Sequence, residues 1–133
     1  MKILFIGGTG TISMAISKLL LSQGHTLYLL NRGNRKLSLS GDLVELKADV
    51  NDEDRVNELI KELHFDAVAD FIAFEPPQLE RDYRLFKGKT DQFIFISSAS
   101  AYQKPLAHYL INEGTPLANP YLEYSRNKIA CED

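Results

Sequence analysis

Tyr124 and Lys128 are the residues whose types and spacing best suit acid–base chemistry. They lie four positions apart in a segment expected to be helical, so their side chains share one face. A free phenol has a pKa of about 10 and is a poor base at neutral pH. A lysine ammonium beside it favours the phenolate, so the pair is a candidate for proton transfer. Taken alone, this spacing more often reflects a partly buried tyrosine beside a solvated lysine.

Ser98 follows a predicted strand over residues 92–97. Ligands of open α/β sheets bind outside the carboxyl ends of the strands. Ser98 is therefore placed to orient a hydroxyl or carbonyl of a substrate by hydrogen bonding. A glycine loop, this serine and the Tyr–Lys pair occur in that order along the chain, which is more specific than any one of them.

The glycine loop runs from Gly7 to Ser13 with the sequence GGTGTIS, between a predicted strand and a predicted helix. Gly7 permits a tight turn, and Gly10 lets the main chain approach a pyrophosphate. The start of the helix behind them offers unpaired N–H groups and a favourable dipole. Ser13 stands where a third glycine is usual, and we expect it to separate helix and strand slightly. The alternative is a glycine-rich turn that binds nothing.

Asn31 and Arg32 follow the second predicted strand. Sites that prefer NAD commonly place an acid here, on the ribose 2′-hydroxyl, and this chain has none. A guanidinium can pair with a 2′-phosphate. Arg32 therefore predicts NADP in preference to NAD, with a solvated loop arginine as the alternative.

Apolar runs alternate with helical stripes along the chain. We expect strands over 3–6, 26–30, 43–48, 66–71 and 92–97. Helices are expected after Gly10, after Asn51 or Asp52, at Pro76-Pro77 and from near Pro120, the last still running at Asp133, with a loop over 101–119. This alternation predicts an α/β fold with a doubly wound parallel sheet, the Rossmann fold.

The bulk properties bound the function. The 133 residues suit one domain, 1–133. A net charge of -3 without a basic cluster argues against nucleic-acid binding, and no apolar run approaches the about 20 residues that span a membrane. A single cysteine, Cys131, rules out an internal disulfide framework and favours the cytoplasm. The three histidines have no metal-ligand spacing, so we expect no metal.

These motifs resemble the extended short-chain dehydrogenase/reductase superfamily, specifically its NAD-dependent epimerase/dehydratase family. The resemblance covers essentially the whole chain. It rests on the glycine loop, Ala48 to Val50, Asp66 to Val68 with Phe71 to Ala73, Phe95 to Tyr102, and Tyr124 to Lys128.

The resemblance implies five strands in the order 3-2-1-4-5 and a bound NAD(P). The implied pyrophosphate site is Gly7, Thr9, Gly10, Thr11 and Ile12, with Asn31 and Arg32 at the adenosine ribose, Asp49 and Val50 at the adenine, and Phe71, Ile72 and Ala73 at the nicotinamide ribose. Ser98 is implied to position the substrate, Tyr124 to act as acid and base, and Lys128 to hold ribose hydroxyls and tune Tyr124.

Members of this family continue with further strands and a smaller C-terminal domain that selects the substrate. We therefore expect residues 1–133 to be an incomplete domain that is inactive alone and prone to self-association through its fifth strand. The full-length protein is expected to be a homodimeric epimerase, dehydratase or reductase that acts on a nucleotide-sugar or related substrate by hydride transfer. The alternative is a non-catalytic NAD(P)-binding sensor or an RNA-associated regulatory module.

Overall fold

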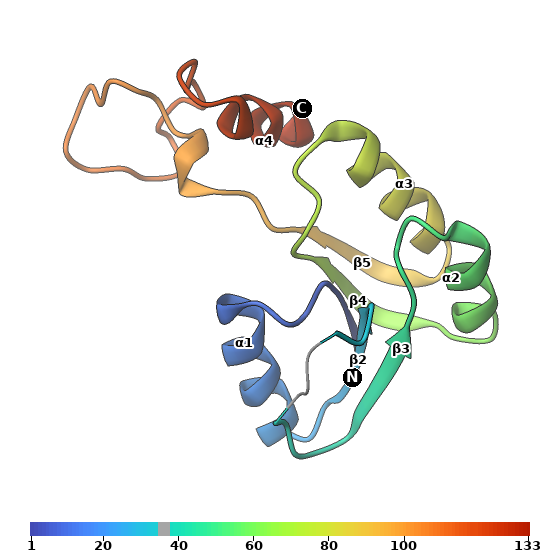
Figure 1. The fold of residues 1–133 in the computed structure, drawn as a ribbon. Helices are drawn as coiled ribbons and strands as arrows, with labels where there is room; N and C mark the ends of the chain where they lie inside the picture. The colour runs from blue at the N-terminus through green and yellow to red at the C-terminus, as the bar shows by residue number, and fades with distance from the viewer. Residues whose placement is uncertain (35–37) are drawn as a thin grey trace.

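The computed structural model, which describes residues 1–34 and 38–133, confirms the predicted α/β sheet (Figure 1). Its five strands are all parallel and lie in the order β3-β2-β1-β4-β5. They are β1 (Lys2–Ile6), β2 (Thr26–Asn31), β3 (Leu43–Lys47), β4 (Phe65–Asp70) and β5 (Thr90–Phe95). The strand order is the one that the sequence resemblance implies.

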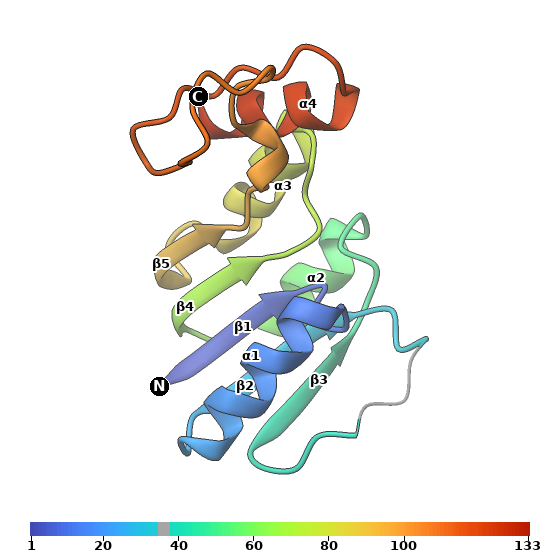
Figure 2. The same cartoon turned by 90° about the vertical axis from the view of Figure 1, so that its left-hand side faces the viewer.

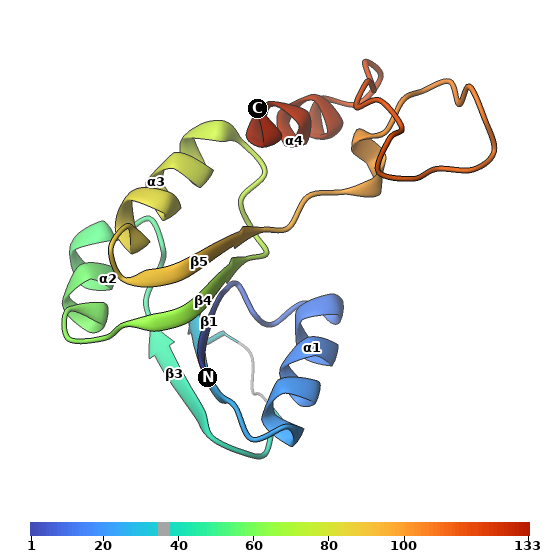
Figure 3. The same ribbon diagram turned by 180° about the vertical axis from the view of Figure 1, so that it is seen from behind.

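Helices cover both faces of this sheet. They are α1 (Thr11–Ser22), α2 (Glu53–Ile60), α3 (Pro76–Phe86), α4 (Glu123–Glu132) and the short 3-10 helix η1 (Ala99–Ala101). Helix α1 lies on one face, and α2 and α3 lie on the other (Figure 3). Helix α4 contacts α3 and η1 (Figure 2). No helix in the two described ranges is both long and apolar enough to cross a bilayer.

The apolar run of β1 is continuous because both faces of the strand are buried. Leu4 and Ile6 pack into the core beneath α2 and α3, whereas Ile3 and Phe5 pack into the core beneath α1. The first strand is thereby held at the centre of the molecule. The glycine loop follows directly at its carboxyl end and therefore lies where the parallel strands end.

Local signals in the sequence fix the ends of several helices. Gly24 follows α1 with φ +78°, a left-handed conformation that glycine adopts at little cost. Asp52 caps α2 by accepting a hydrogen bond of 3.1 Å from the Arg55 amide. Pro76 occupies the first turn of α3, where a missing N–H group is harmless.

Several boundaries differ from the prediction. Strand β4 covers 65–70 instead of 66–71, and β5 covers 90–95 instead of 92–97, because the apolar residues that follow each strand belong to the connections beyond it. Helix α4 begins at Glu123 instead of near Pro120, because Leu122 is still extended with φ -112° and ψ 128°. The loop over 101–119 contains an antiparallel bridge between Tyr102 and Leu117, and it extends away from the sheet (Figure 1).

Candidate functional site

A cavity of about 990 Å³ opens beyond the carboxyl ends of the strands. This is the point where the chain leaves β1 toward one face and β4 toward the other, the usual ligand-binding crevice of such sheets. Its volume is in the range of small-molecule sites, roughly 300–1,000 Å³. All but one of the site residues predicted from the sequence line it: Gly7, Thr9, Gly10, Thr11, Ile12, Asn31, Arg32, Asp49, Val50, Phe71, Ile72, Ser98, Tyr124 and Lys128.

The remaining predicted residue, Ala73, is buried beside the cavity with 1% of its surface exposed. Its carbonyl accepts a hydrogen bond from the Lys128 ammonium. Ala73 therefore belongs to the support of the site, behind the residues that line it.

Gly7 and Gly8 leave room that side chains would fill. Gly7 has φ +79°, and a Cβ there would lie 2.1 Å from Cγ2 of Ile72 on the opposite wall. A Cβ on Gly8 would lie 2.5 Å from Cδ2 of Leu29, so Gly8 is needed for packing against β2. At Gly10 a Cβ would meet only the Ser13 hydroxyl at 3.6 Å, so the loop is open at this point.

Ser13 closes one end of the loop. Its hydroxyl accepts from the Gly10 amide at 2.9 Å and donates to the Gly10 carbonyl at 3.1 Å. This role was not predicted, although a serine at the third position of a helix is a known signal for such a cap. In the described part of the chain, the amides of Thr11 and Ile12 have no acceptor. These N–H groups at the start of α1 can hold an anion.

Two charged side chains lie at the end of β2 and β3. The backbone amide of Asn51 holds the pKa of Asp49 below its usual value, helped by the Asn51 side chain and by the charge of Arg32. Asn31 accepts from the Gly33 amide at 2.7 Å through Oδ1, whereas its Nδ2 is buried without a partner among the described residues. This end of the cavity thus offers a carboxylate and a guanidinium.

The opposite wall carries the predicted acid–base residues. Tyr124 is 45% exposed, and Nζ of Lys128 lies 5.8 Å from the centre of its ring. Lys128 itself is only 3% exposed, and its Nζ donates to the carbonyls of Ala73 and Ile96 at 2.7 Å each. An ammonium has three N–H bonds, so one is left for a ligand. Burial lowers the pKa of Lys128, and the charge of Asp70 opposes that effect.

Ser98 stands at the start of η1 on the same wall. Its hydroxyl accepts from the Ser100 amide at 3.2 Å and lies 2.9 Å from the Ser100 hydroxyl. A hydroxyl, a phenol and an ammonium thus line one part of the cavity, and the start of α1 lines another. This arrangement can hold a phosphate-bearing ligand and move a proton at its other end.

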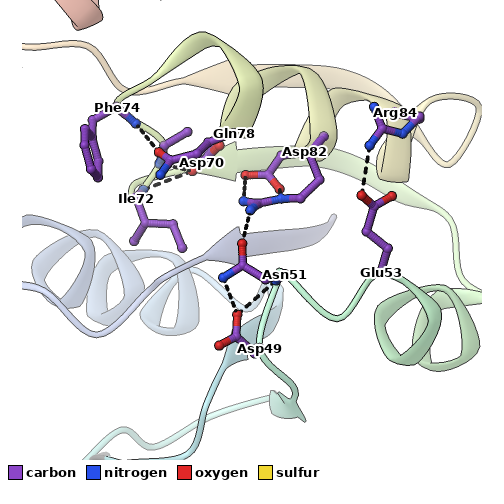
Figure 4. A network of polar contacts seen from close by, with 11 residues as sticks. Asp49, Asn51, Glu53, Asp70, Ile72, Phe74, Gln78, Asp82 and Arg84 are labelled. Carbon is purple, nitrogen blue, oxygen red and sulfur yellow. Dashed lines mark hydrogen bonds and ion pairs between the residues drawn. The ribbon is translucent and has the colours of Figure 1, made fainter.

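A polar network that runs from the cavity wall at Asp49 to the buried Asp82 was not predicted (Figure 4). Arg81 donates to both carboxyl oxygens of Asp82, at 2.7 and 3.0 Å, and to the side-chain oxygen of Asn51. The Asn51 side chain in turn donates to Asp49 at 2.8 Å. Burial raises the pKa of Asp82 to about 7, with a further rise from the nearby Asp70 and an opposing effect of Arg81. The network joins the cavity wall at Asp49 to α3.

Asp70 completes this network at the end of β4. It is fully buried, and its Oδ1 accepts from the amides of Ile72 and Ala73 at 2.9 and 3.0 Å (Figure 4). The only sequence signal for Asp70 is an acid at the end of an apolar strand. No group of three metal-ligating side chains is present within residues 1–34 and 38–133.

A family model described as the NAD dependent epimerase/dehydratase family matches residues 3–84. Among curated proteins, the chain is similar to chloroplast stem-loop binding protein of 41 kDa b from Arabidopsis thaliana. The two are 30% identical over 116 residues, which cover 77% of this chain and 30% of that protein.

Solved structures with the same fold include UDP-glucose 4-epimerase from Bifidobacterium longum in complex with NAD+ and UDP (TM-score 0.84, 20% identity, 99% of this chain and 47% of that chain). The UDP-Glc/GlcNAc 4-epimerase from Campylobacter jejuni is also similar (TM-score 0.83, 22% identity, 98% and 46%). So is the Bordetella bronchiseptica enzyme WbmG in complex with NAD (TM-score 0.78, 19% identity, 99% and 48%). The chain spans about half the length of these structures.

Proposed function

Because the chain belongs to the NAD dependent epimerase/dehydratase family, we propose that its cavity binds a nicotinamide adenine dinucleotide. The observation that carries this proposal is the pair of unused amides of Thr11 and Ile12, which face a cavity whose far wall bears Tyr124 and Lys128. The NAD+ bound in the Bifidobacterium epimerase and the NAD bound in WbmG support it.

In this proposal, different residues of the chain bind different parts of the dinucleotide. The start of α1 and the glycine loop hold the diphosphate, since the loop is open at Gly10 and Gly7 has no side chain of its own between the main chain and the cavity. Asn31 and Arg32 bind the adenosine ribose, and Asp49 and Val50 flank the adenine. The turn from Phe71 to Ala73 lines the nicotinamide ribose, where Lys128 offers its remaining N–H bond.

The dinucleotide would supply a hydride acceptor and donor at the nicotinamide ring. Tyr124 would take a proton from a substrate hydroxyl or return one to a carbonyl, since its phenol lies beside the Lys128 ammonium and at the cavity surface. Ser98 would hold the same substrate oxygen by a hydrogen bond. We propose a nucleotide-sugar as the substrate class, supported by the UDP in the Bifidobacterium epimerase complex.

We also propose that residues 1–133 form the cofactor-binding part of an epimerase, dehydratase or reductase and are inactive alone. The similar structures are about twice as long as this chain, which covers 47% of the first of them. A separate substrate-selecting domain in the full-length protein would account for that difference.

The role of Tyr124 is tested by Tyr124→Phe in the full-length protein. We expect the dissociation constant for the dinucleotide to stay within about twofold and kcat on a panel of UDP-sugars to fall by about 100-fold or more, the usual contribution of a general acid or base. Tyr109→Phe is the control, because Tyr109 is 82% exposed on the distant loop. Unchanged turnover in Tyr124→Phe would exclude the assigned role.

The choice of cofactor is tested by titrating the full-length protein with NADPH and NADH separately. The sequence predicts NADP from Arg32, whereas the cofactors of the similar structures favour NAD. If Arg32 reads a 2′-phosphate, Arg32→Ala lowers NADPH affinity about tenfold, the loss expected for one charge-assisted pair, and leaves NADH affinity unchanged. The exposed Arg55→Ala on α2 is the control.

A nucleic-acid-binding module is the second candidate, because the curated relative is named a stem-loop binding protein. The net charge of -3 provides little electrostatic attraction for phosphates. Fluorescence anisotropy with a labelled RNA stem-loop at 50 and 200 mM salt distinguishes a nucleic-acid-binding module from a protein that binds only the dinucleotide. Saturable binding that weakens steeply with salt would favour this second function.

A further inference from the structure

The Lys128 ammonium occupies an unusual place for a charge. It is almost completely buried, and the groups next to it, the carbonyls of Ala73 and Ile96 and the Phe95 ring with its centre 4.3 Å away, carry no net charge. Carbonyls orient an ammonium but do not balance its charge, and an unbalanced buried charge is costly. Some nearby anion must therefore compensate for it.

Asp70 is bonded to the same two residues from the other side. Its carboxylate accepts from the Ala73 amide, and its backbone carbonyl accepts from the Ile96 amide at 3.0 Å. The residues that hold Lys128 by their carbonyls are thus held by Asp70 through their amides. The second carboxyl oxygen of Asp70 is buried and accepts from no nitrogen or hydroxyl donor within the described ranges, although the Asp82 carboxyl group lies close enough to hydrogen-bond with Asp70.

We propose that Asp70 is a positioning residue for Lys128: its carboxylate fixes Ala73, whose carbonyl holds the ammonium, and its buried anion balances the charge of that ammonium. The proposal rests on the proposed function, in which Lys128 serves the cofactor and Tyr124. It assigns to a side chain outside the cavity lining a specific part in building the site.

The charges around both groups are consistent with this balance. Burial lowers the pKa of Lys128, and Asp70 is the largest of the opposing influences, ahead of Cys131 and Glu132 on the same helix. Asp70 also lies next to Asp82 on α3, whose carboxyl group has a pKa raised to about 7 and accepts hydrogen bonds from Arg81. Asp70 thus stands between the Lys128 ammonium on α4 and the Arg81–Asp82 pair on α3.

The substitution Asp70→Asn separates charge from geometry, because the asparagine oxygen can still accept from the amides of Ile72 and Ala73. We expect the pKa of Lys128 to fall in this variant. The measurement is the ¹⁵N resonance of the Lys128 side chain against pH in the cofactor-free, full-length protein, assigned with Lys128→Arg. In turnover, we expect the alkaline limb of the kcat profile to move to lower pH.

Asp66→Asn is the matched control, because Asp66 lies on the same strand but pairs with the Lys2 amide at the far end. We expect no change in the Lys128 titration there. An unchanged Lys128 pKa in Asp70→Asn would overturn the proposal. A lowered pKa in a protein that binds no dinucleotide would sustain it while excluding the proposed function.

A double-mutant cycle covers the case in which Asp70→Asn does not fold. If the fault is the uncompensated Lys128 charge, adding Lys128→Met removes that charge, and the double variant folds with a higher thermal midpoint than Asp70→Asn alone. If the double variant is as unstable as the two separate losses predict, the two residues do not act on each other, and the proposal fails.

Discussion

At the scale of single residues, the two walls of the cavity can approach each other at Gly7 because this residue has no side chain. Its φ of +79° places it in the left-handed region, and Ile72 from the β4–α3 turn occupies the space where a Cβ would be. A side chain at residue 7 would therefore displace a cavity-lining residue from a different part of the fold.

Gly24 offers a matched comparison for Gly7. It has nearly the same φ, +78°, but a Cβ there would meet no atom of residues 1–34 or 38–133 within 4 Å. Gly24→Ala should lower the free energy of unfolding by about 1 kcal/mol from backbone strain alone. Gly7→Ala should lower it by about 3 kcal/mol, since overpacking adds to the same strain.

Urea unfolding measures this difference, and the dinucleotide titration should show weaker binding only in Gly7→Ala. Equal losses of stability in the two variants would mean that Ile72 moves aside freely and does not constrain the loop.

The residues that could be predicted from the sequence are those whose role is local. Gly7, Gly10, Tyr124 and Lys128 are recognised from a turn or a helical spacing, and the structure brings all four to one cavity. Asp70 was not predicted, because its partners Ala73 and Ile96 are identified only once the turn after β4 and the end of β5 lie side by side.

At the scale of elements, α3 is tied to the cavity by charge as well as by packing. Its Asp82 is fully buried and bound by Arg81, which reaches the Asn51 side chain after β3. Because the pKa of Asp82 rises from 3.8 to about 7, the folded chain retains a proton at a pH where the unfolded chain has lost it.

This retained proton predicts how stability depends on pH. The stabilising contribution is complete below about pH 4 and is lost as pH rises toward 7, with a slope of up to about 1.4 kcal/mol per pH unit. Relative to Asp82→Asn, the native protein should therefore lose stability over this window. Urea unfolding at pH 5 and pH 8 tests the prediction, with the exposed Asp54→Asn on α2 as the control.

A constant difference in stability between the native protein and Asp82→Asn over this pH range would show that Asp82 is ionised throughout it.

The number and order of the elements could be predicted, but their ends could not all be placed. Phe71 and Ile96 extend the apolar runs of β4 and β5, although each lies just past its strand and lines the cavity. Hydrophobicity alone does not distinguish a residue buried in the sheet from one that lines a crevice beside it. The bridge between Tyr102 and Leu117 joins residues too distant in sequence for any periodicity to indicate.

At the scale of the whole molecule, the cavity lies between two sets of elements. The glycine loop and the ends of β2 and β3 form one wall, and the turn after β4, Ser98 and α4 form the other. A ligand that contacts both walls would join them, so binding should stabilise the whole fold.

We expect NAD or NADP at 100 times its dissociation constant to raise the free energy of unfolding by about 2.7 kcal/mol. AMP and nicotinamide mononucleotide are the controls, because each reaches one wall only and should stabilise less at the same concentration. Thermal unfolding of the full-length protein measures both. If AMP alone gave the same stabilisation as the dinucleotide, the far wall would contribute nothing to binding.

The hydrogen bonds of Lys128 also bear on how activity can be diagnosed in proteins that share this fold. The ammonium donates hydrogen bonds to the segments that follow two neighbouring strands, so it stabilises the structure in addition to its proposed role at the cofactor. A related protein without catalytic activity would still need these two hydrogen bonds for its structure, so retention of the lysine is a poor marker of an active enzyme. Tyr124 is nearly half open to solvent and contacts the Phe74 ring, with ring centres 6.3 Å apart, but it makes no such link between strands. Under the proposed function, loss of Tyr124 would mark a protein that keeps the pocket without the reaction.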